Sequence, residues 1–65
     1  MRLTVNGELR EVQAGTVESM VKELGLDNKL IVVEIDGQIV EKQDWSDVAL
    51  REGMKVEIVH FVGGG

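Results

Sequence analysis

Few residues of this 65-residue chain are of a type that carries enzyme chemistry. Cys is absent and His60 is the single histidine, which excludes disulfides, thiolate zinc sites, cysteine nucleophiles and metal sites with several histidine ligands. A hydroxyl nucleophile needs a positioned base, and no spacing connects Thr16, Ser19 or Ser46 to an imidazole. We interpret His60 as a solvated residue of a strand. The sequence therefore predicts no active site and no metal site.

The segment 56–62 is the most informative for function. Side chains alternate along a strand, so that burial of Val56 and Ile58 would turn Val59 and Phe61 outward. Together with Val62, this exposed apolar pair would form a partner-docking surface on the approach to the end of the chain. In the alternative interpretation, the segment around the single tryptophan covers the pair. The residues alone leave both interpretations open.

The three residues after this segment are Gly63, Gly64 and Gly65. Glycine has no Cβ, so an extended glycine segment can enter a crevice too narrow for other residues. Its functional group would be the carboxylate of Gly65. Ordering three residues costs roughly 3 to 6 kcal/mol, which would keep a complex reversible. The alternative is a frayed end or an added remnant without a role.

Net charge and hydropathy limit the classes of partner that the chain could bind. Seven basic and twelve acidic side chains give a net charge of −5, which argues against nucleic acid because phosphates require Lys and Arg. The longest apolar run, 30–33, is far too short to span a bilayer, and no basic-then-apolar leader opens the chain. We expect a soluble, cytoplasmic domain that binds neither nucleic acid nor membrane.

A hairpin is predicted first. Apolar residues alternate with polar ones over the first five positions, and Asn6-Gly7 is a strong turn signal because both central residues of a type I′ turn need positive φ. A strict two-residue turn would place Arg10 and Val12 of the return strand, 9–13, on the core face and Leu9 outside. A longer turn with a bulge would change this, and both remain open.

One helix is predicted over 17–24. Thr16 is a suitable N-cap, and Gly25 followed by Leu26 is typical of a Schellman motif at the C-terminus. Glu18 lies in the first turn, where the helix dipole favours an anion. The apolar stripe at helical spacing consists of Val17, Met20, Val21 and Leu24.

The second half of the sequence, from residue 30 on, predicts three further strands. The β-branched run 30–35 is apolar on nearly both faces, which favours a strand flanked by other strands. Asp36-Gly37 predicts a second hairpin, leading into 38–40. We interpret 41–47 as an irregular turn fixed by Trp45, and 55–62 as the last strand.

These elements predict an α+β fold with one helix packed across a mixed four- or five-stranded sheet. This arrangement is the β-grasp, or ubiquitin-like, fold, although the same order could build another small α+β roll. We expect a β-grasp domain over 1–62 and a flexible glycine tail over 63–65.

The same residues resemble a known family. The ending Val-Glu-Ile-Val-His-Phe-Val-Gly-Gly-Gly resembles the C-terminus of the ThiS family, the sulfur carriers of thiamine biosynthesis. The segment 35–40, Ile-Asp-Gly-Gln-Ile-Val, with Trp45 shortly after it, resembles the middle of those proteins. A Gly-Gly end is shared by all ubiquitin-like carriers, but the combination is more specific and covers essentially the whole chain. Glu41-Lys42 and Met54 depart from the family pattern in a loop and a turn.

The resemblance implies a protein co-substrate rather than an enzyme. A ThiF-type adenylating enzyme would use ATP to adenylate the carboxylate of Gly65, and the chain itself would bind no cofactor. Sulfur delivered by a cysteine desulfurase route would displace AMP and leave a thiocarboxylate, from which thiazole synthase takes the sulfur. By position, Gly65 would carry the sulfur and Gly64 would permit entry. The docking face is instead inferred from the alternation along the last strand, and we expect it to comprise Val59, Phe61, Val62 and Gly63.

Two other functions are compatible with the sequence. A molybdopterin-synthase small subunit resembles ThiS in fold and tail chemistry, and its partner would be the large synthase subunit. A non-covalent ubiquitin-like interaction module would keep its partners after Gly65 is removed.

Overall fold

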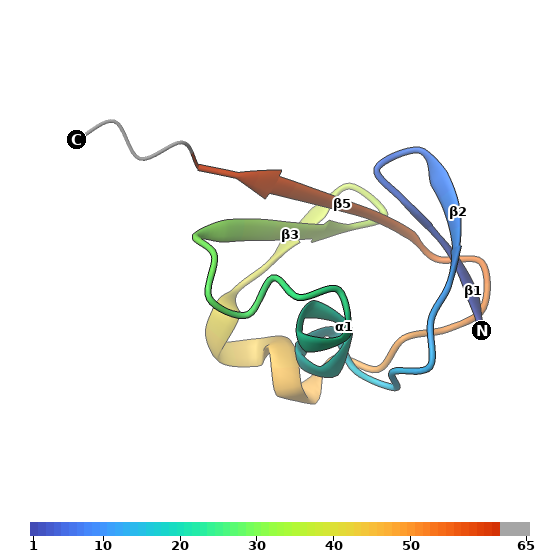
Figure 1. The fold of residues 1–65 in the computed structure, drawn as a ribbon, viewed down its shortest axis with the longest axis horizontal. Helices are drawn as coiled ribbons and strands as arrows, with labels where there is room; N and C mark the ends of the chain where they lie inside the picture. Colours follow the sequence, from blue (N-terminus) through green and yellow to red (C-terminus); the bar gives the residue numbers. More distant parts are fainter. Residues whose placement is uncertain (62–65) are drawn as a thin grey trace.

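The computed structural model describes residues 1–61, which form a five-stranded sheet with helices on one side (Figure 1). The strands lie in the order β2-β1-β5-β3-β4. In chain order the elements are β1 (Arg2–Val5), β2 (Glu8–Glu11), α1 (Val17–Glu23), β3 (Ile31–Ile35), β4 (Gln38–Val40), the 3-10 helix η1 (Lys42–Asp47) and β5 (Lys55–His60). The predicted α+β architecture is confirmed, with five strands rather than four.

The first hairpin has the strict two-residue turn. Val5 pairs with Glu8, and φ is 51° at Asn6 and 82° at Gly7, as a type I′ turn requires. Leu9 is therefore on the outside of the sheet and 67% exposed, whereas Val12 is buried. Arg10 shares the face of its cross-strand partner Leu3, but β2 is an edge strand and the arginine stays exposed.

Both ends of α1 are formed as the sequence predicts. Thr16 caps the helix through a capping box with Ser19, in which each side chain meets the other's backbone N–H. At the other end, the Leu26 N–H donates to the Val21 carbonyl and the Gly25 N–H to the Lys22 carbonyl, the two bonds of a Schellman motif. These local bonds satisfy backbone groups that a short helix would otherwise leave unpaired.

The prediction of an irregular turn over 41–47 is wrong. This segment contains the regular 3-10 helix η1, and Trp45 within it is buried. The indole Nε1 donates to the carbonyl oxygen of Val40 at 2.9 Å, which links the helix to the end of β4. The Trp45 ring thus fills part of the core while its one polar atom has a hydrogen-bond partner.

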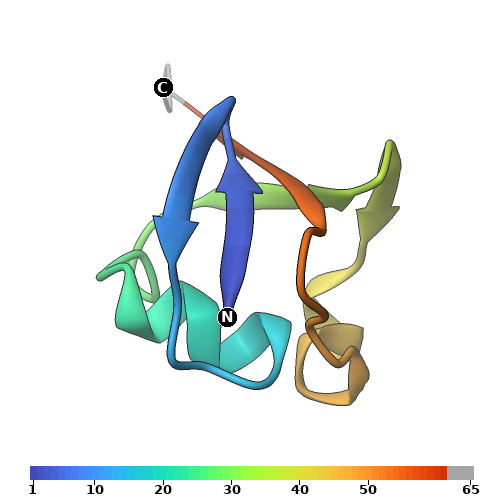
Figure 2. The same ribbon diagram turned by 90° about the vertical axis from the view of Figure 1, so that its right-hand side faces the viewer.

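The core lies between the sheet and the two helices. Figures 1 and 2 both show α1 and η1 on the same side of the sheet. The buried cluster contains Leu3, Val5, Val12, Ala14, Val17, Met20, Val21, Ile31, Val33, Ile35, Trp45, Leu50, Met54, Val56 and Ile58. No helix within residues 1–61 is long and apolar enough to cross a bilayer.

Candidate functional site

Strand β5 occupies the centre of the sheet. It runs parallel to β1, with Val5 opposite Val56, and antiparallel to β3, where the paired residues extend from Ile31–His60 to Ile35–Val56. Strand β1 pairs with Lys55 and Val56, and β3 pairs with every residue from Val56 to His60, so each residue of β5 is paired on at least one side. Backbone pairing to β3 thus holds this strand up to its last residue, His60.

The alternation predicted for β5 is confirmed. Val56 and Ile58 are buried, whereas Val59 is 46% and Phe61 55% exposed. The alternative in which the tryptophan segment covers Val59 and Phe61 is wrong, because Trp45 lies in the core on the other side of the sheet. Exposure makes this pair available to a partner, and its docking role stays a prediction.

The structure adds residues of β3 to this surface. Phe61 donates its backbone N–H to the carbonyl of Leu30 at 3.0 Å, and Val59 pairs with Val32. Directly paired residues place their side chains on the same face. Leu30, 70% exposed, thus lies beside Phe61. We call Leu30, Val32, Val59 and Phe61 the outer-face patch.

Sequence reasoning did not include Leu30 and Val32 in the docking surface. A local signal for them exists, because they alternate with the core residues Ile31 and Val33 along one strand. The neighbours of Phe61 depend on the pairing register between two segments some thirty residues apart. The alternation within one strand does not determine that register.

Two glutamates lie next to the outer-face patch. Glu34 and Glu57 are directly paired across β3 and β5, one step of the alternation from Val32 and Val59. Neither carboxylate forms an ion pair within residues 1–61, where the single salt bridge joins the Met1 ammonium to Glu11. The exposed face of the sheet therefore combines apolar side chains with two carboxylates that form no ion pair within residues 1–61.

Four of the predicted functional residues lie outside the described residues. They are Val62 and Gly63, assigned to docking, and Gly64 and Gly65, assigned to the sulfur-carrying end. Their roles stay predictions. What the structure defines is the base from which they extend, namely Phe61 at the edge of the outer-face patch.

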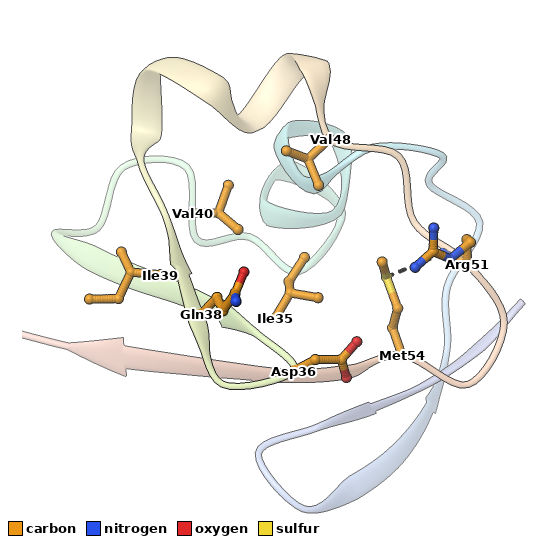
Figure 3. A pocket seen from close by; sticks show the side chains of 8 residues that line it. All are labelled: Ile35, Asp36, Gln38, Ile39, Val40, Val48, Arg51 and Met54. Carbon is orange, nitrogen blue, oxygen red and sulfur yellow. Dashed lines mark hydrogen bonds between the residues drawn. The ribbon is translucent and has the colours of Figure 1, made fainter.

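A surface hollow of about 440 Å³ lies elsewhere, between hairpin β3–β4 and the segment that joins η1 to β5 (Figure 3). Its apolar side chains include Ile35, Val48 and Met54. The Asp36 carboxylate in its wall accepts the backbone N–H of Lys55 at 3.3 Å. The side chains that line this hollow include no nucleophile beside a base, so it offers no catalytic arrangement.

The described residues also hold no cluster that could bind a metal ion. His60, at the end of β5, is exposed, in agreement with its interpretation as a solvated strand residue. Within residues 1–61, what the arrangement can offer is a binding surface leading to the glycine segment.

Comparisons with known proteins identify the relationship. The chain is similar to a sulfur carrier protein ThiS of Bacillus subtilis, with 39% identity over 51 residues, 78% of this chain and 77% of that protein. It is 46% identical over 66 residues to a thiazole synthase of Paramagnetospirillum magneticum, covering 100% of this chain and 20% of that protein. The chain thus spans about a fifth of the length of the thiazole synthases that it matches.

A solved structure gives the same relationship in three dimensions. The crystal structure of a thiamine biosynthesis protein (ThiS) from Geobacter metallireducens matches with a TM-score of 0.83 and 30% identity, over 100% of both chains. The predicted β-grasp fold is confirmed by this match. The model of the ThiS family matches residues 3–65, nearly the full sequence and the final glycines included. The chain belongs to the ThiS family.

Proposed function

We propose that this chain is a sulfur carrier of thiamine biosynthesis, with Gly65 as the residue that carries the sulfur. The observation that carries the proposal is the family match through residue 65, combined with a β-grasp domain whose central strand ends at His60, three residues before the first of the final glycines in the sequence. In this function the chain is a protein co-substrate and not an enzyme.

The chemistry follows from the low reactivity of a carboxylate. One oxygen of the Gly65 carboxylate attacks the α-phosphorus of ATP on a ThiF-type adenylating enzyme, and pyrophosphate leaves. A sulfur nucleophile at the oxidation level of hydrosulfide then attacks the acyl carbon. The bond to AMP breaks, a carbon–sulfur bond replaces it, and a thiocarboxylate remains. A cysteine desulfurase that delivers a persulfide sulfur requires an added thiol reductant for this last step.

Two groups of residues have different roles in this proposal: the final glycines enter the partner's active site, and the residues before them bind its surface. Gly64 and Gly65 have no side chain, which suits entry into a narrow active site. Val59 and Phe61, together with Val62 and Gly63, face the partner and hold the domain against it. ATP is bound by the adenylating enzyme, and the chain itself supplies the acyl group.

Thiazole synthase is the proposed acceptor. Two thiazole synthases contain a region similar to the whole of this chain, which supports a shared reaction. The names of the relatives favour thiamine biosynthesis over a molybdopterin-synthase small subunit. Because adenylation consumes ATP, we place the reaction in the cytoplasm.

The proposal is tested by mass spectrometry after incubation with ATP, a sulfur source and the cognate adenylating enzyme. Replacing oxygen by sulfur adds nearly the same mass as oxidation of Met1, Met20 or Met54, so the intact mass alone does not distinguish them. The added mass must lie in the C-terminal fragment, react with an alkylating agent and vanish when Gly65 is deleted.

If the mass does not change while the same enzyme modifies another carrier, the proposal is wrong. The non-covalent interaction module would then explain the fold. Deletion of Gly65 separates the two functions as well, because a non-covalent module keeps its partners without that residue.

A further inference from the structure

The face of the sheet opposite α1 and η1 is uncovered within residues 1–61. Both helices pack on the other side (Figures 1 and 2), and every remaining element belongs to the sheet itself. The outer-face patch lies on the uncovered side, at the end of β5 that leads to the glycines. Ile39 of edge strand β4 adds a further exposed apolar side chain next to Glu34, its cross-strand partner.

The pair Glu34–Glu57 is unusual in this setting. The two residues are directly opposite each other, and like charges in this arrangement destabilise a sheet. Lys55 occupies the next outward position on β5, yet no ion pair between it and either glutamate is formed within residues 1–61. In the described part of the chain, neither of these carboxylates is therefore held in an ion pair.

A partner that covers the outer-face patch must also meet these carboxylates. An apolar partner surface would remove water from them, and an unpaired charge in such an interface is strongly unfavourable. A cationic side chain placed between the two carboxylates would offset both their desolvation and their mutual repulsion. Arginine suits this position best, because its planar group can donate to two carboxylates at once.

Chain length requires the partner to lie near Phe61. Four residues separate Phe61 from the end of Gly65, and a fully extended segment of that length spans at most about 14 Å. Delivery of Gly65 to an active site therefore brings the surrounding enzyme surface close to Phe61. The outer-face patch begins at Phe61 and continues toward the two glutamates.

We propose that the outer-face patch and the Glu34–Glu57 pair form one docking surface, and that its occupant is an apolar surface of thiazole synthase with an arginine or lysine between the two carboxylates. The inference rests on the proposed function and adds a specificity element to it. The apolar side chains provide contact area, and the glutamates reject partner surfaces that lack the cation.

The test compares binding of thiazole synthase to three full-length chains by isothermal titration calorimetry at low and high salt. The first is unmodified, the second carries Glu34→Gln and Glu57→Gln, and the third carries Glu18→Gln and Asp27→Asn. The third changes the net charge equally, but on α1 and the loop after it, where neither side chain makes a hydrogen bond or ion pair within residues 1–61. It controls for long-range electrostatics.

The Glu34→Gln/Glu57→Gln chain is expected to bind about tenfold more weakly or worse, with a flatter dependence on salt. Its urea midpoint is expected to rise or stay the same, because a repulsion within the domain is removed. The control chain is expected to bind within about twofold of the unmodified chain. Weaker binding together with undiminished stability is a combination that loss of folding cannot produce.

Unchanged or tighter binding of the Glu34→Gln/Glu57→Gln chain overturns the inference, and so does an equal loss in the control. Failure of the unmodified chain to bind thiazole synthase also overturns it. If the double variant instead impairs adenylation alone, the occupant is the adenylating enzyme and not thiazole synthase. Formation of the thiocarboxylate on the unmodified chain remains a separate measurement, so the proposed function can hold when this inference fails.

Discussion

The side chain of Asn6 bridges both backbone groups of Ile58. Its Nδ2 donates to the Ile58 carbonyl at 3.2 Å, and its Oδ1 accepts the Ile58 N–H at 2.7 Å. Strand β1 ends at Val5, where the chain turns away from β5. The amide of Asn6 therefore continues the parallel ladder one step beyond the strand. Asn6 thus has two roles, because it forms the turn between β1 and β2 and also binds the backbone of β5.

Replacing Asn6 by glycine is expected to destabilise the domain by about 1–2 kcal/mol, because two hydrogen bonds to β5 are lost. Glycine retains the positive φ of 51° found at this position without strain. Asp36→Gly is the matched control, since Asp36 also begins a type I′ turn, with φ 49°, but its side chain accepts a single hydrogen bond, from the Lys55 N–H at 3.3 Å. Urea unfolding should show the larger loss for Asn6→Gly, and equal losses would contradict the bridging role.

Replacing Phe61 by aspartate is expected to leave folding nearly intact and to weaken adenylation by the partner enzyme. Phe61 is more than half exposed, so its replacement removes little buried apolar area from the folded state. The substitution also introduces a charge into the proposed docking surface. Leu9→Asp makes a similar change at an exposed residue on edge strand β2 and should leave adenylation unaffected. A large drop in stability for Phe61→Asp would show that the ring belongs to the core.

Replacing Glu23 by glutamine is expected to cost about 1–2 kcal/mol, because charge-assisted hydrogen bonds are weakened. The carboxylate of Glu23 accepts the backbone N–H groups of Gln13 and Ala14, at distances from 2.8 to 3.1 Å, and so connects α1 to the preceding loop. Glu18→Gln, in the first turn of the same helix, removes a carboxylate without such bonds and should cost less. Faster amide exchange at Gln13 and Ala14 would accompany the loss, and unchanged exchange would refute it.

Replacing Gly25 by alanine is expected to cost about 1 kcal/mol of stability. Gly25 has φ +74° at the end of α1, a conformation that strains any residue with a Cβ, although no atom lies within 4 Å of the added methyl. Gly15 has equally open surroundings and no positive φ, so Gly15→Ala should be neutral or slightly stabilising. Thermal unfolding of the two variants separates backbone strain from steric contact, and similar midpoints would argue against the strain.

The sequence by itself determined the features whose causes lie within a few residues. Asn6-Gly7 and Asp36-Gly37 adopt the positive φ of type I′ turns, and both ends of α1 form the predicted caps. Alternation along β5 separated its buried from its exposed residues. In each case the deciding interactions are turn chemistry, capping hydrogen bonds or the period of a strand, all of which are readable from neighbouring residues.

Local sequence signals do not distinguish two conformations when the choice between them depends on packing against residues far along the chain. Alternation along the return strand is compatible with two registers, and the structure has the two-residue turn, with Val12 buried and Leu9 exposed. The segment 41–47 reads as irregular because it is polar apart from Trp45. The burial of that ring and its bond to Val40 accompany a regular 3-10 helix.

The proposed docking surface follows only in part from the sequence. Val59 and Phe61 follow from the strand period, but Leu30 beside Phe61 and Glu34 opposite Glu57 depend on the register between β3 and β5. The contact of Asn6 with Ile58 joins residues 52 positions apart. Such pairings are selected by the packing of the whole core between sheet and helices, because a shift of one residue would turn every buried side chain of a strand toward water.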